Sequence, residues 1–194
     1  MGVLVKEVPA VSDTRARMID AAIDALRRRG VAGMSFTEVL RESGAARGAI
    51  YHHFPGGKSQ LVAEAAARNG QDVRGHLAAL PAGNPVEVVE AFLGGVRPVV
   101  EASASGGGCA VAAVTVDAGE LRPVAATAFE SWIGQLAERL TTAGLEPGEA
   151  ADLAATLIIL LEGAHVLCRA SGDLQPFDQA VRTAVALTRS RYVS

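Results

Sequence analysis

Aromatic residues are scarce in this 194-residue chain: Phe, Trp and Tyr make up 4% of it, although 49% of the residues are hydrophobic. A core with so few rings depends on alanine and aliphatic side chains, which favour helices over strands. Cysteine is also rare, because Cys109 and Cys168 are the only two and they lack metal-ligand spacing. We therefore expect an all-α protein without a disulfide framework, a bound metal or a cofactor.

Long hydrophobic runs are missing as well. The most apolar stretch, Leu153 to Leu161, is interrupted by Thr156 and ends at Glu162. It is much shorter than the roughly 20 residues that a membrane span needs. Residues Met1 to Val11 lack the charged start and the apolar run of a signal peptide. The sequence therefore predicts a soluble, cytoplasmic protein that does not bind a membrane.

Charge is distributed unevenly along the chain. The net charge of −3 excludes a polybasic nucleic-acid binder. However, residues 1–60 carry nine Lys or Arg against six Asp or Glu, a net charge of +3, and the remainder carries nine against fifteen, a net charge of −6. A basic head on an acidic body indicates two separate functions.

Apolar residues recur with helical spacing almost throughout, and glycine or proline separates the periodic segments. In the first segment Ile19, Ala22, Ile23 and Leu26 form a stripe that we expect to be buried. Gly30 stands where a left-handed residue would end this helix, after three arginines that suit a helix C-terminus. In total we expect about nine helices, over residues 14–29, 35–43, 46–52, 58–80, 85–105, 109–116, 121–143, 148–171 and 176–191.

Two short helices in the basic head indicate a helix-turn-helix. Ser35 and Glu38 form a capping box, in which the hydroxyl accepts from the third helical amide and the carboxylate reaches back to the cap. The second short helix would enter the major groove, with Ile50 and Phe54 as core anchors. Small residues allow close approach, and polar side chains supply donors for phosphates and base edges. The predicted DNA-binding residues are Ser35, Thr37, Arg47, Gly48, Ala49, Tyr51, His52 and Lys58.

Residues 13–61, and above all Ala45 to Lys58 with the run Ile-Tyr-His-His-Phe, resemble the N-terminal domain of TetR/AcrR-family transcriptional regulators. The resemblance implies that Tyr51 and His52 contact DNA and that Lys58 contacts a phosphate. Two positions depart from the family pattern. Ala46 replaces the Ser or Thr that often opens the recognition helix, and Gly57 replaces a Ser or Asn cap, although Gly is itself an acceptable N-cap.

The body resembles the LmrA/YxaF-like branch of this family at residues Gly108–Asp117, Phe129–Trp132 and Leu161–His165. The resemblance implies a helix-turn-helix domain over residues 1–57 and an effector-binding and dimerisation domain over residues 58–194. It also implies a homodimeric repressor that binds a palindromic operator in double-stranded DNA and releases it on binding a hydrophobic or aromatic small molecule. For the dimer contact we favour the helices expected at 121–143 and 148–171.

The effector pocket should combine apolar shape with occasional polar atoms. The predicted ligand-binding residues are Phe92, Cys109, Phe129, Trp132, His165, Cys168 and Phe177. Each aromatic could instead be a plain core residue. Glu162, His165 and Arg169 can share one helix face, which favours a polar cluster over a ligand triad. The two cysteines could sense oxidants, but buried and inert thiols are the safer interpretation.

Other functions have less support. The sequence contains no Gly-x-Ser-x-Gly elbow, His-Glu-x-x-His motif, dinucleotide fingerprint or paired-carboxylate signature, so we do not expect an enzyme. Gly57-Lys58-Ser59 resembles the end of a phosphate-binding loop, but His52 stands where that motif requires glycine. The adjacent His52 and His53 point in different directions on a helix and have no third ligand nearby. The alternative that remains is a helical interaction or ligand-binding module without specific DNA binding.

Overall fold

The computed structural model describes residues 11–81, 83–116 and 119–192, with side chains from residue 14 onward. Within these residues it has nine helices and no strand, which confirms the all-α prediction. The expectations that fall on residues 1–10 and on Asp117 lie outside the described residues. The helices are α1 (Val11–Gly33), α2 (Phe36–Ser43), α3 (Ala49–His53), α4 (Gly57–Ala78), α5 (Pro85–Ala104), α6 (Ala110–Ala113), α7 (Arg122–Thr142), α8 (Pro147–Ser171) and α9 (Gln175–Tyr192).

The first helix has the buried face that its periodicity predicts, since Ile19, Ala22, Ile23 and Leu26 are at most 6% exposed. Gly30 takes the expected left-handed conformation, with a φ of 66°. The helix does not end there, however. It continues across a kink to Gly33, because residue 30 leaves helical geometry for a single position.

The two short helices of the head differ from the prediction in two details. The Ser35 hydroxyl accepts from the Glu38 amide at 3.2 Å, as expected. The Glu38 carboxylate does not complete the capping box, because it is buried beside arginines of α1. Helix α3 begins at Ala49, three residues later than predicted, since no side chain caps its start and the turn closes from the Ala49 amide to the Ala46 carbonyl.

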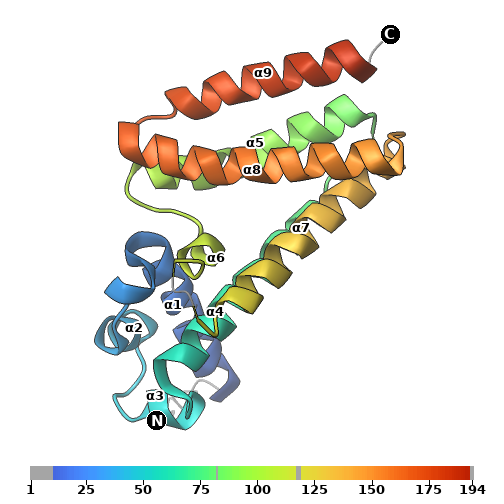
Figure 1. The fold of residues 1–194 in the computed structure, drawn as a ribbon. Coiled ribbons are helices and arrows are strands. Elements are labelled where there is room, and N and C mark those ends of the chain that lie inside the picture. Colours follow the sequence, from blue (N-terminus) through green and yellow to red (C-terminus); the bar gives the residue numbers. More distant parts are fainter. Residues whose placement is uncertain (1–10, 82, 117–118, 193–194) are drawn as a thin grey trace, which may run out of the picture.

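The helices form two connected groups (Figure 1). Helices α1, α2 and α3 lie at one end, and α5, α8 and α9 lie side by side at the other. Helices α4 and α7 run between the two groups and pack against each other, while α4 also packs on α1. Gly70 allows this close approach, because a Cβ there would come within 2.9 Å of the Ala128 Cβ. The same contact is fixed by the Trp132 indole, which donates to the Gly70 carbonyl at 2.8 Å.

Helix α8 runs through the middle of the body and packs against α5, α7 and α9. It is the one helix of the described residues that is long and apolar enough to cross a membrane by length and composition alone. Its inner side, however, includes Leu157, Ile158 and Leu161, which are at most 5% exposed in the core. Helix α8 is therefore a core helix of the body, although its Ile159, Val166 and Leu167 are exposed.

Candidate DNA-binding head and effector cavity

The predicted DNA-reading side chains project from a short helix that the core holds firmly. Ile50 is 1% exposed and Phe54 is fully buried, as the sequence predicts for core anchors. Tyr51, between them, is 67% exposed and makes an edge-to-face contact with Phe36 of α2, with ring centroids 6.0 Å apart. The chain thus presents a large ring to solvent at the end of the head, where a structural role would favour burial.

The other predicted DNA-binding residues lie in the same part of the chain. Ser35 and Thr37 are exposed at the start of α2, and Arg47 and Gly48 are exposed in the turn before α3. Ala49 and His52 belong to α3, and Lys58 stands in the first turn of α4. The structure therefore brings all eight residues to α2, α3 and the helix start that follows them.

The body contains an inner cavity of about 310 Å³ that is lined mainly by apolar side chains. An outer groove of about 800 Å³ adjoins it, between the end of α1, the segment before α6 and the outer side of α8. Arg27, Gly108, Cys109, Glu162 and His165 line both spaces, so they form the boundary between cavity and groove. A cavity of this size and character suits a small organic ligand.

Four of the seven predicted ligand-binding residues line the inner cavity: Phe92, Cys109, Trp132 and His165. The other three are not brought to it. Phe129 packs edge-to-face on Trp132 at 5.1 Å, behind the cavity wall. Cys168 and Phe177 are fully or almost fully buried in the core. Helical spacing shows that these side chains face inward, but it does not distinguish packed core from a cavity wall.

Burial shifts the ionisable groups at the cavity boundary toward their neutral forms. It raises the pKa of Glu162 to about 7, against the opposing effect of a hydrogen bond from the Cys109 thiol. It lowers the pKa of His165 to about 4, with a smaller contribution from the charge of Arg27. Burial and the nearby Glu162 also raise the pKa of the Cys109 thiol well above its usual range. These shifts favour an inert Cys109, since the thiolate is the reactive form.

Sequence reasoning missed four polar residues of the cavity wall, one of which is the exposed His76 at its edge. Glu162 was assigned only to a polar cluster with His165 and Arg169, all three of which line the outer groove. Asn69 is a buried polar residue on the otherwise apolar inner face of α4, a pattern that could have identified it. Arg27 comes from the head, and its local pattern gave no sign that it reaches the body.

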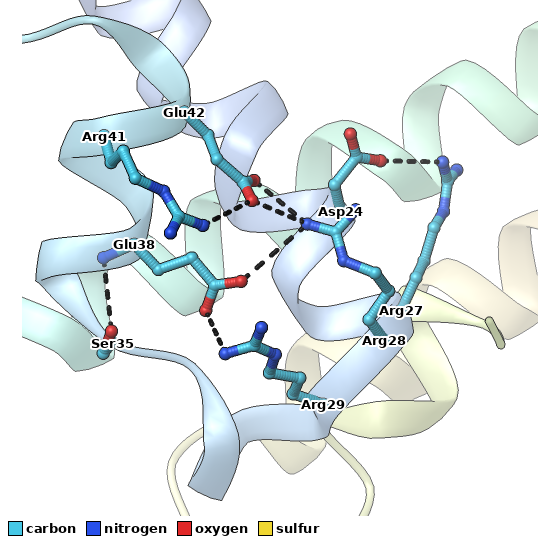
Figure 2. A network of polar contacts seen from close by, with 8 residues as sticks. All are labelled: Asp24, Arg27, Arg28, Arg29, Ser35, Glu38, Arg41 and Glu42. Atoms are coloured by element: carbon cyan, nitrogen blue, oxygen red, sulfur yellow. Dashed lines mark hydrogen bonds and ion pairs between the residues drawn. The ribbon is translucent and has the colours of Figure 1, made fainter. Parts of the chain in front are cut away.

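The end of α1 carries three consecutive arginines whose side chains pair with acidic residues, and Arg28 and Arg29 share Glu38 (Figure 2). Arg27 pairs with Asp24 at 3.6 Å and also lines the cavity. Arg28 binds both carboxylate oxygens of Glu42, at 3.0 and 3.1 Å. Arg29 lies 3.1 Å from the carboxylate of Glu38, which is only 5% exposed. Two of the three arginines therefore hold α2 against α1.

The main chain at the same point contacts the body. Arg169 of α8 donates to the Arg28 carbonyl at 3.2 Å. Gly108, next to α6, approaches so closely that a Cβ there would lie 3.3 Å from the Arg27 carbonyl oxygen. The last helical turn of α1 therefore touches the cavity, α8 and α2 together. The end of α1 is thus a common neighbour of α2, α8 and the segment before α6.

The Arg29–Glu38 pair yields the first prediction. Arg29→Ala should lower the free energy of unfolding by about 1–3 kcal/mol, because it leaves a buried carboxylate without its nearest cation. The same substitution in a Glu38→Gln background should cost clearly less. Urea unfolding of the four proteins of this double-mutant cycle measures the difference. Arg41→Ala is the control, since Arg41 is 73% exposed and should change stability by less than about 0.5 kcal/mol. An equal cost of Arg29→Ala in both backgrounds would show that the pair does not stabilise the head.

Comparison with known proteins agrees with this architecture. Residues 18–65 match the family model described as bacterial regulatory proteins of the tetR family. Residues 85–183, about half of the chain, match the model of the LmrA/YxaF-like C-terminal domain of transcriptional regulators. The uncharacterized HTH-type transcriptional regulator Rv0196 of Mycobacterium tuberculosis is 36% identical over 84% of this chain and 88% of that protein. The HTH-type transcriptional regulator LmrA of Bacillus subtilis is 26% identical over 84% and 90% of the two chains.

Solved structures show the same fold. A TetR-family transcriptional regulator from Agrobacterium tumefaciens superimposes with a TM-score of 0.78 at 21% identity, over 95% of this chain and 100% of that one. These relatives are transcriptional regulators and not enzymes. The chain therefore belongs to the TetR family of bacterial transcriptional regulators, with an N-terminal helix-turn-helix domain and an LmrA/YxaF-like C-terminal domain.

Proposed function

We propose that this regulator is a cytoplasmic, homodimeric repressor that binds a palindromic operator and releases it when a hydrophobic or aromatic small molecule enters the inner cavity. The observation that carries the proposal is that the end of α1 lines the cavity through Arg27 and pairs with α2 of the head through Arg28 and Arg29. A ligand that fits one arrangement of the cavity better than another changes the position of the head.

Exposure and chemistry of α3 support its assignment as the recognition helix. Tyr51 and His52 offer hydroxyl and imidazole groups to base edges and phosphates, and Gly48 lets the backbone approach the groove. Lys58 adds a positive charge at the start of α4, where helix amides favour a phosphate. Ser35, Thr37, Arg47 and Ala49 complete the proposed contact surface.

Exposed apolar side chains on α8 and α9 support a dimer through these two helices. Ile159, Val166 and Leu167 are 71%, 67% and 57% exposed on α8, and Leu187 is 64% exposed on α9. Such a patch on a soluble protein usually marks an interface. The exposed positions of α7 include Glu130, Gly134 and Glu138 and carry no large apolar side chain. We therefore assign the dimer contact to α8 with α9, and no longer to α7 with α8.

Two such subunits would present their recognition helices to half-sites about one helical turn apart, roughly 34 Å or slightly more. Substitutions in α3 and α4 test this role. Tyr51→Ala should weaken specific binding about ten- to a hundredfold, because a base or phosphate contact is lost. Lys58→Ala should weaken binding to all duplexes and lower the salt slope by about one unit. Fluorescence anisotropy, with duplexes tiled across the DNA that flanks the gene and random duplex as competitor, measures both effects.

Arg182→Ala is the control for these variants, since Arg182 is an exposed cation of α9 far along the chain from the head. It should leave binding unchanged. Weak and uniform binding to every duplex, which disappears as salt rises, would contradict the proposed operator recognition. The chain would then be a helical ligand-binding module that has lost specific DNA binding.

The dimer assignment has its own test. Ile159→Glu should convert the protein to a monomer, because it places a charge in the centre of the proposed apolar contact. Sedimentation velocity measures the molecular mass of each variant in solution. Gly134→Glu on α7 should remain dimeric, as a Cβ at Gly134 meets no atom within 4 Å. If Gly134→Glu dissociates the protein and Ile159→Glu does not, the interface lies on α7.

A further inference from the structure

The inner cavity contains a carboxylate oxygen that nothing in the described part of the chain satisfies. Oε1 of Glu162 is buried and has no hydrogen-bond partner there. The Cys109 thiol, a weak donor, is the side chain that hydrogen-bonds to this carboxyl group. Since buried polar atoms almost always have a partner, an unsatisfied oxygen in a ligand-sized cavity indicates a missing donor.

A second acceptor adjoins it on the same helix. The Ser103 hydroxyl lies 3.1 Å from the Val99 carbonyl, to which it donates, and 2.6 Å from Nδ1 of His165. A hydroxyl has one proton, so the contact with His165 is satisfied when Nδ1 carries the imidazole proton and donates to Ser103. Nε2 of the neutral ring is then an acceptor. Glu162 and His165 are one helical turn apart and both line the cavity.

The other ionisable groups that face this site do not supply the missing donor. Cys109 keeps its proton and hydrogen-bonds to Glu162. Arg27 pairs with Asp24, and its side chain is 38% exposed to solvent. His76 is exposed at the cavity edge, where its Nδ1 lies 2.7 Å from the Asp72 carbonyl. Arg169 is in the outer groove and binds the Arg28 carbonyl. Asn69, the remaining polar side chain of the wall, does not hydrogen-bond to Oε1 of Glu162 either. The wall therefore leaves the Glu162 carboxyl group without a strong donor.

We propose that the effector of this regulator is an organic amine, in which an apolar or aromatic body fills the cavity and a protonated amino group donates to Glu162 and to Nε2 of His165. This inference rests on the proposed function, because it names the chemical class of the effector. The free protein holds the carboxyl group of Glu162 in an apolar environment without a cation at hydrogen-bonding distance. A cationic ligand restores that charge pairing, while a neutral ligand does not.

The probes that test the proposal are 1-naphthylmethylamine, the neutral 1-naphthylmethanol and the anionic 1-naphthoic acid, which share one ring system. Trp132, the only tryptophan of the chain, lines the cavity and reports binding by its fluorescence. At pH 8 the amine should bind at least about tenfold more tightly than the alcohol, and the acid should bind most weakly. Equal or tighter binding of the alcohol or the acid would overturn the proposal.

Glu162→Gln removes the charge and keeps the shape of the side chain. It should abolish the preference for the amine and leave the affinity for the alcohol within about twofold, which also shows that the cavity still forms. Glu146→Gln is the matched control, because Glu146 is exposed at the start of the same helix and should keep the preference. A preference for the amine that survives in Glu162→Gln would exclude Glu162 as the recognition group.

The pH dependence of binding to the wild-type protein is a further test. Because burial places the pKa of Glu162 at about 7, the carboxylate fraction grows as pH rises through neutrality. Affinity for the amine should therefore rise between pH 6 and pH 8 and then level off, while affinity for the alcohol stays constant. His165 is neutral across this range. His76→Gln, measured in parallel, is the control for the exposed imidazole at the cavity edge. An affinity for the amine that falls as pH rises would overturn the proposal.

DNA binding separates this inference from the proposed function. If the protein binds an operator specifically and the alcohol releases it but the amine does not, the amine proposal is overturned and the proposed regulatory function stands. A protein that binds the amine through Glu162 but retains no specific duplex would overturn the regulator proposal and support the ligand class.

Discussion

The last helical turn of α1 before its kink at Gly30 is the point on which the rest of the structure depends. There the side chains of Arg28 and Arg29 hold the acidic residues of α2, while Arg27 lines the inner cavity. The main chain of the same turn is touched by Gly108 and by Arg169 of α8. Three consecutive residues of α1 thus make the contacts with α2, with α8 and with the cavity. The end of α1 therefore joins the cavity wall to α2 of the head through packed groups that tolerate little compression.

The surroundings of this turn fit a regulator that must hold two arrangements of similar stability. In the head a buried carboxylate pairs α2 with α1, and the core anchors Ile50 and Phe54 hold α3. The cavity has apolar walls and an unsatisfied acid, so the unliganded state is not the most favourable arrangement for Glu162. A ligand that satisfies this group stabilises whichever arrangement of α1 and α8 it fits.

Much of the fold follows from local sequence. Helical periodicity and glycine or proline breakers predict nine helices, and Ile50 and Phe54 anchor α3 as expected. The failures concern contacts between distant segments. The three arginines are typical of a helix C-terminus. The Arg28 carbonyl nevertheless accepts a hydrogen bond from the Arg169 side chain, 141 residues further along the chain. Glu38 fits a capping box, but the nearby cations draw its carboxylate elsewhere. In the body, spacing identified inward-facing side chains and could not separate the cavity wall from the core. The predicted ligand-binding residues therefore did not include Glu162 or Arg27.

The central claim is that α8 influences DNA binding through the end of α1, and Arg169→Ala tests it most directly. This variant removes a bond to the Arg28 carbonyl and lies outside the DNA-reading helices. Its affinity for the retained operator duplex should be measured by anisotropy at fixed salt, with sedimentation velocity to confirm the oligomeric state. We predict a loss of about three- to tenfold relative to the wild-type protein and to Arg182→Ala, with the same oligomeric state and helical content. An unchanged affinity would contradict the claim that the end of α1 connects the two halves of the regulator.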